Sequence, residues 1–104
     1  MSDAEVIVIH ADKDLEDLIP EFLDNRRSDV ESIRSALAND DYETIRVLGH
    51  SMKGSGGGYG FDDITEIGGA LEQAAKRKDN TAIGDELGKL ASYLARIEVV
   101  YEEL

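Results

Sequence analysis

The segment GHSMKGSGGGYG, residues 49–60, contains a histidine, a lysine three residues later and then five glycines in seven positions. An imidazole can act as a nucleophile, a proton carrier or a metal ligand, and an ammonium group can hold a phosphate. Two kinds of chemistry fit these residue types. Either the glycines form a loop around a phosphate, or a helix presents one reactive imidazole, His50, on its open face.

A phosphate-binding loop is disfavoured by the order of the residues. The G-x-x-x-x-G-K-[ST] motif needs a hydroxyl residue directly after its lysine, in a turn between a strand and a helix. Here Lys53 is followed by Gly54, and the residues before it have helical spacing. A dinucleotide-binding fingerprint fails because no strand leads into the glycines.

A helix through His50 predicts which residues share its face. At about 100° per residue, Lys53, Gly54 and Gly57 return to the side of His50, and so does Arg46 four residues before it. One interpretation is that the glycines only end the helix and that His50 is an ordinary surface residue. However, each glycine inside a helix costs roughly 0.8–1.0 kcal/mol relative to alanine. This cost favours the interpretation that small residues clear space around the imidazole for another protein.

An accessible imidazole suits attack on an electrophile. Exposed imidazoles are mostly neutral near pH 7, because the ordinary pKa of histidine is about 6.5, so no helping base is needed. A lysine nearby would offset the charge of an arriving phosphoryl group. Hydrolytic catalysis and a histidine metal site are disfavoured, because the other histidine, His10, lies far away near the N-terminus. We therefore predict no bound metal and no cofactor, and we interpret His10 as structural or incidental.

The composition limits the class of protein. A chain of 104 residues with 41% hydrophobic content is expected to form one domain, residues 1–104. Its 23 acidic and 11 basic residues give a net charge of −12, which disfavours binding to nucleic acid or to an anionic membrane. The absence of cysteine excludes disulfides and thiol chemistry. With no signal peptide or membrane span expected, we predict a soluble cytoplasmic protein whose partners are proteins.

The spacing of apolar residues predicts four amphipathic helices. Pro20 suits the first turn of a helix that runs to the NDD segment at residues 39–41. Asp40 and Glu43 form a plausible capping box for the second helix, which leads into the glycines. The third helix follows the glycines and ends at KRKDN, residues 76–80. The fourth reads as one long helix with apolar positions three and four residues apart, at Ile83, Leu87, Leu90, Leu94, Ile97, Tyr101 and Leu104.

These elements predict an all-α fold, an antiparallel up-down-up-down four-helix bundle over roughly residues 15–104. Residues 1–13 are expected to form an extended lead-in segment, or a short extra helix across one end of the bundle.

The segments LGHSMKGSGGGYGF and ALEQAAKRKD closely resemble the histidine-containing phosphotransfer (HPt) domains of bacterial phosphorelays. That family reads roughly A-H-x-L-K-G-S-x-G-x-x-G, followed by a helix ending in L-E-x-A, and the resemblance covers essentially the whole chain. It implies that His50 is phosphorylated on its outer ring nitrogen and that Lys53 is its positive neighbour. It also implies that Gly54 and Gly57 are small so that a receiver domain can dock, and we add Arg46 to this partner-binding face.

Two other positions of the family motif have counterparts in this chain. The resemblance implies that Met52 is the buried aliphatic residue and that Gly60 closes the helix. The chain departs from the pattern at Gly49, where alanine is usual, and at Gly56 and Gly58, which are additional glycines.

The resemblance implies a phosphorelay intermediate without an ATP site or autokinase activity. It would accept a phosphoryl group from the aspartate of a receiver domain and pass it to the aspartate of a response regulator. The implied partners are response-regulator receiver domains and a hybrid sensor kinase, and the aspartate pocket and magnesium ion that drive the transfer belong to the receiver. We expect the protein itself to be a monomer.

Two alternatives share the same fold. One is an adaptor bundle in which His50 is never phosphorylated, since a fold does not fix a function. The other is a phosphoacceptor module of a chemotaxis kinase, which we disfavour because such a module would lead directly into its first helix and continue into further domains. We expect either a free-standing protein or a trimmed domain of a hybrid kinase.

Overall fold

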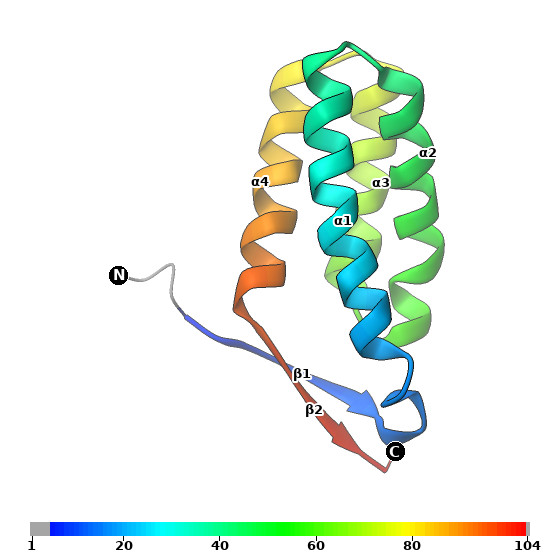
Figure 1. Ribbon diagram of the computed structural model, residues 1–104, viewed down its shortest axis with the longest axis vertical. Helices are drawn as coiled ribbons and strands as arrows, with labels where there is room; N and C mark the ends of the chain where they lie inside the picture. Colours follow the sequence, from blue (N-terminus) through cyan, green and yellow to red (C-terminus); the bar gives the residue numbers. More distant parts are fainter. Residues whose placement is uncertain (1–4, 104) are drawn as a thin grey trace.

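The chain folds into a group of four helices with a pair of short strands at one end, as the computed structural model shows for residues 5–103 (Figure 1). The predicted helical bundle is therefore confirmed, with the strand pair as an addition. The links between successive helices are short, as expected of antiparallel neighbours. The elements are β1 (Ile7–Asp12), the 3-10 turn η2 (Lys13–Leu15), α1 (Ile19–Ala38), α2 (Tyr42–Ser55), the 3-10 turn η3 (Gly57–Tyr59), α3 (Asp62–Lys76), α4 (Asn80–Arg96) and β2 (Ile97–Glu102).

Local residues explain where the helices start. Pro20 lies in the first turn of α1, as predicted. The start of α2 is capped by Asp41, whose carboxylate accepts a hydrogen bond from the backbone N–H of Thr44 at 3.2 Å. The predicted capping box of Asp40 and Glu43 is therefore wrong. Asp40 adopts a left-handed backbone conformation with φ 54°, which places it in the turn one residue before the cap.

The core runs along the inner faces of all four helices. Its largest fully buried side chains come from every helix and from the link before α3: Ile19, Ile33, Ile45, Met52, Phe61, Ile64, Leu71, Ile83 and Leu90. At the end of the bundle near the glycines, the ring of Phe22 stacks on Tyr59 and Phe61, with centroid distances of 4.5 and 5.6 Å. These aromatic contacts hold the glycine-rich link against α1.

The fourth helix is shorter than predicted. It ends at Arg96, and Ile97–Glu102 forms strand β2, which pairs in parallel with β1. Side chains of β2 alternate between partly buried and exposed, a period of two that suits a half-buried strand. Apolar residues at three- and four-residue steps also fit this segment, and only the presence of β1 beside it favours the strand. The last residue of the predicted helix, Leu104, lies outside the described residues.

The predicted lead-in segment is extended where it can be described. β1 buries Ala11 and partly buries Ile7 and Ile9, so this segment covers one end of the bundle as a strand and not as a helix. Residues 1–4 of that segment lie outside the described part of the chain.

Candidate functional site

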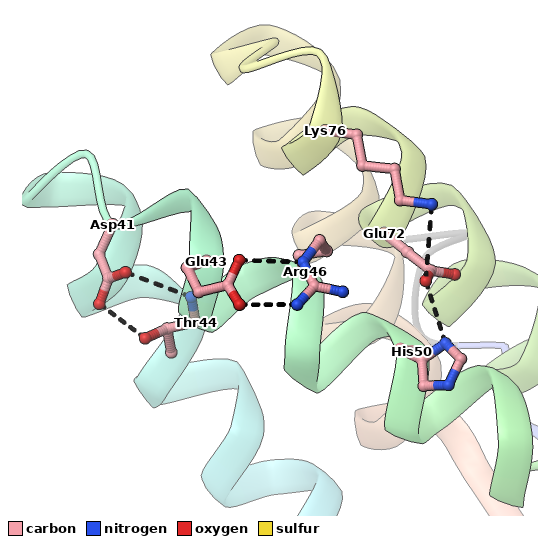
Figure 2. A network of polar contacts seen from close by, with 7 residues as sticks. All are labelled: Asp41, Glu43, Thr44, Arg46, His50, Glu72 and Lys76. Atoms are coloured by element: carbon pink, nitrogen blue, oxygen red, sulfur yellow. Dashed lines mark hydrogen bonds and ion pairs between the residues drawn. The ribbon is translucent and has the colours of Figure 1, made fainter.

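His50 projects from the outer face of α2. The inner face of the same helix carries Ile45, Gly49 and Met52, all buried, so the helical repeat turns His50 outward. Its side chain is 69% exposed, and its Nδ1 atom lies 3.0 Å from Oε2 of Glu72 on α3 (Figure 2). The second ring nitrogen points away from Glu72. The imidazole is thus held on one side and open on the other.

Glu72 is a buried carboxylate surrounded by cationic or protonatable groups. Only 6% of its side chain is exposed, and its oxygens lie 3.5 Å from Nζ of Lys53 and 3.9 Å from Nζ of Lys76. Burial raises the pKa of Glu72, but the hydrogen bond to His50 and the nearby positive charges outweigh it, and the pKa is lowered overall. The stabilisation from this ionised carboxylate is therefore present above its ordinary pKa and is lost only as the pH falls through the lowered value.

The ionised state of Glu72 fixes the tautomer of His50. A carboxylate can only accept hydrogen bonds, so the Nδ1 atom of His50 must donate, and the proton of the neutral ring sits there. The exposed nitrogen, Nε2, is then left with a free lone pair. In the neutral ring, the accessible atom is therefore the nucleophilic one.

Lys53 lies at this site, whereas Arg46 pairs with Glu43. Lys53 lies one turn after His50 and shares Glu72 with it. Arg46 lies one turn before His50, and its guanidinium makes two hydrogen bonds with Glu43, of 3.0 and 2.6 Å (Figure 2). A partner that used Arg46 would have to compete with Glu43.

The two predicted docking glycines occupy different environments. Gly54 is exposed in the last turn of α2, and no atom lies within 4 Å of the place where a Cβ would sit. Gly57 lies beyond α2, which ends at Ser55, so the expectation that it is an interior residue of this helix is wrong. Its backbone N–H donates to Oγ1 of Thr65 at 2.7 Å, which ties the turn η3 to α3.

The motif position Met52 lies as the resemblance implied, but Gly60 does not close the helix of His50, because α2 ends at Ser55. Met52 is fully buried in the core. Gly60 has φ 90°, a left-handed conformation that favours glycine, and it ends η3, which follows α2 directly.

The backbones of α2 and α3 approach closely at a pair of glycines. A Cβ on Gly49 would lie 2.7 Å from the carbonyl oxygen of Gly68, and a Cβ on Gly68 would lie 2.6 Å from the backbone nitrogen of Lys53. Neither position has room for a methyl group unless the helices move apart. Gly68 and Glu72 lie one turn apart on α3, as do Gly49 and Lys53 on α2, so this contact sets how far Glu72 stands from His50.

We expect Gly68→Ala to lower the free energy of unfolding by about 1–3 kcal/mol, because the added methyl group overpacks a backbone contact. Gly84→Ala is the matched control. Gly84 lies inside α4 with open space around it, so alanine there should stabilise by about 0.5–1 kcal/mol. Chemical denaturation of both variants measures the difference, and equal stabilities would contradict the close approach.

Sequence reasoning missed three residues of this site: Glu72, Gly68 and Val47. Glu72 is part of the quoted ALEQAAKRKD segment, but nothing in its spacing shows that it faces a residue 22 positions earlier. Val47 could have been found from helical spacing, since it lies three residues before His50, and its side chain is half exposed.

We expect Glu72→Gln to release the tautomer of His50, because an amide can donate as well as accept a hydrogen bond. Nitrogen-15 NMR of the imidazole should show the proton almost entirely on Nδ1 in the unaltered protein and shared between both nitrogens in the variant. Glu86→Gln is the control, since Glu86 pairs with Lys89 and not with His50. If the proton remains on Nδ1 in Glu72→Gln, the carboxylate does not set the tautomer.

Comparison with known proteins places this geometry in a family. Residues 17–99 match the family model of the Hpt domain, a span that includes all four helices and therefore His50 and Glu72. No curated protein and no solved structure matches the chain. Within residues 5–103 no helix is both long and apolar enough to cross a membrane. By the extent of the family match, the chain belongs to the Hpt domain family.

Proposed function

We propose that this protein is a phosphorelay intermediate that carries a phosphoryl group on Nε2 of His50. Hpt domains act in phosphotransfer in two-component signalling, and they interact there with receiver domains and kinases. The observation that carries the proposal for this chain is the pairing of His50 with the buried Glu72, which leaves one ring nitrogen exposed. The donor would be the phosphoaspartate of a receiver domain in a hybrid sensor kinase, and the acceptor the aspartate of a response regulator.

The transfer needs no catalytic base from this chain. The lone pair of Nε2 attacks the phosphorus atom of the aspartyl phosphate, an N–P bond forms, and the P–O bond to the aspartate breaks. No proton has to leave Nε2, because the ring proton is on Nδ1. The phosphorylated ring carries a positive charge, which the Glu72 carboxylate 3.0 Å away stabilises. The reverse attack by a second aspartate regenerates the neutral imidazole.

Lys53 supplies charge next to the phosphoryl group. Its side chain is 52% exposed, so Nζ can leave Glu72, 3.5 Å away, and turn toward a new anion. A phosphohistidine adds nearly two negative charges, and a nearby ammonium group favours it. The role proposed for Lys53 is therefore to stabilise the phosphorylated form.

The surface around His50 suits docking of another protein. Val47 is 50% exposed one turn before His50, and Gly54 is one turn after it. An exposed apolar side chain beside a glycine without close neighbours offers a partner helix both contact area and room. The family resemblance suggests Gly57, which is exposed on η3, as a further small docking residue.

We expect His50→Gln to abolish labelling when the protein is incubated with a phosphorylated receiver domain. The label on the unaltered protein should be stable in base and lost in acid, as a phosphoramidate is. Because the glutamine amide can still donate a hydrogen bond to the buried Glu72, the variant should keep its helical circular dichroism and unfold at a similar temperature. His10→Gln is the control and should be labelled normally.

Label that persists in His50→Gln would move the phosphoacceptor to another residue. Absence of label on the unaltered protein, with receiver domains that phosphorylate other Hpt proteins, would favour the adaptor alternative.

We expect Gly54→Gln to separate docking from folding. The added side chain meets no atom of its own chain, so stability should rise by up to about 1 kcal/mol as the glycine penalty is removed. It would stand on the His50 face, so phosphoryl transfer should fall about tenfold.

Gly88→Gln is the control for Gly54→Gln, since Gly88 is an exposed position in α4 with the same open surroundings. It should gain similar stability and transfer normally. A thermal melt and a transfer assay on the same samples give both quantities. Normal transfer by Gly54→Gln would remove this face from the docking surface.

A further inference from the structure

A groove of about 720 Å³ lies between α3 and α4, at the end of the bundle that carries the strands (Figure 1). Its walls come from the first half of α3 and the second half of α4, and β1 contributes Ile7. Ile67 and Ala70 of α3 give it an apolar side. The described residues that line it include none from α2, so the groove is separate from the pair of His50 and Glu72. Its volume falls in the range of ligand sites, roughly 300–1,000 Å³.

Two buried hydrogen-bond donors of this groove have no partner within residues 5–103: the hydroxyl of Tyr93 and the Nε–H of Arg96. Tyr93 is only 4% exposed. Burial and the nearby charges of Asp63 and Asp62 raise the pKa of Tyr93 to about 12, so the hydroxyl keeps its proton and can donate it. Asp63 also lines the groove, which places the hydroxyl on the groove side of the ring. A ligand that brings an acceptor would recover the free energy lost by burying these donors.

The charges of the groove favour a cation. Glu86 pairs with Lys89 at 3.0 Å, so these two charges offset each other. Asp63 and Glu66 are exposed on α3, and in the part of the chain that the structure describes neither they nor Arg96 form an ion pair. The carboxylates outnumber the cations here, on a protein whose net charge is −12. A positively charged group is therefore attracted to the rim, and an anion is repelled.

We propose that this groove binds an extended segment of a partner protein that carries a lysine or arginine side chain. The buried donors of Tyr93 and Arg96 would bond to a main-chain carbonyl oxygen of the segment. Its cationic side chain would pair with Asp63 and Glu66 on the rim. A neighbouring apolar side chain would pack on the wall of the groove formed by α3. Each group of the groove that lacks a partner within the chain thereby gains one.

Other classes of ligand satisfy fewer of these groups. A phosphate or carboxylate would accept hydrogen bonds from Tyr93 and Arg96, but it would meet the carboxylates of Asp63 and Glu66. A simple amine would pair with those carboxylates and leave the two donors unbonded. Among residues 5–103 no three acidic or histidine side chains converge closely enough to hold a metal ion. A peptide combines the two requirements, because every residue brings a carbonyl oxygen and its side chain can bring the charge.

The position of the groove leaves the imidazole of His50 accessible. His50 projects from the outer face of α2, and the groove lies between α3 and α4. A partner segment in the groove would therefore hold a second protein close to His50 without covering it. This site is distinct from the docking face around Val47 and Gly54, which lies on α2.

NMR titration of the complete chain with the peptide acetyl-Gly-Leu-Lys-Leu-Gly-amide tests the proposal. We expect shifts of backbone amide signals in the first half of α3, the second half of α4 and β1, with a dissociation constant below about 1 mM. The same peptide with glutamate in place of lysine should bind roughly tenfold more weakly, because attraction to the rim becomes repulsion. Added salt should weaken binding of the lysine peptide, since it screens this attraction.

Two variants test the two halves of the contact. Tyr93→Phe removes only the hydroxyl, so the lysine peptide should bind about fivefold more weakly. The fold should not lose stability, because this hydroxyl has no partner within the described chain. Tyr101→Phe on β2, which does not line the groove, is the control. Glu66→Gln should weaken binding about threefold, and Glu21→Gln, at an exposed position of α1, is its control.

Each outcome bears on the proposal. Equal binding of the lysine and glutamate peptides, or undiminished binding by Tyr93→Phe, overturns it, and the second result would mean that only solvent bonds to the hydroxyl. Absence of shifts at about 5 mM peptide, or shifts produced by inorganic phosphate instead, also overturns it. Circular dichroism of each variant checks that the fold is kept. The groove does not include His50 or Glu72, so phosphoryl labelling of His50 can succeed or fail independently of peptide binding.

Discussion

The close contact between α2 and α3 is the constraint on which the candidate site depends. Gly49 and Gly68 let the two backbones meet at distances that no Cβ would permit. Only then does Glu72 reach the imidazole of His50 from the neighbouring helix. A larger residue in either position would separate the helices and lengthen the one contact that orients the histidine, because packed helices transmit such a change along their length.

The pairing of a buried carboxylate with an exposed histidine meets two requirements of the site: a fixed ring tautomer and an open ring nitrogen. Burial gives Glu72 a fixed position, and its low pKa keeps it a pure acceptor, so that the ring proton stays on Nδ1 of His50. Exposure leaves Nε2 open to a partner. Lys53 and Lys76 balance the buried charge, and they also make this small region cationic on a protein of net charge −12.

Glycine occurs at the positions after Lys53 for different physical reasons. Gly56 lies against α3, where a Cβ would be 2.6 Å from Oγ1 of Thr65, and Gly60 adopts a left-handed conformation. Gly54 and Gly58 have open space around them, so packing within the chain does not require glycine there. A single explanation, that glycines clear the approach to His50, therefore fits Gly54 but not Gly56 or Gly60.

The sequence by itself determined the elements whose pattern is local. Apolar spacing located the helices, Pro20 marked the start of α1, and the motif around His50 identified the family, because these signals lie within a few helical turns. The tertiary structure decided what depends on distant segments. It supplied Glu72 to a histidine 22 residues earlier, and it turned Ile97–Glu102 into a strand, because β1 from the other end of the chain lies beside it. Helical and extended patterns fit that last segment equally well, and only a partner strand distinguishes them.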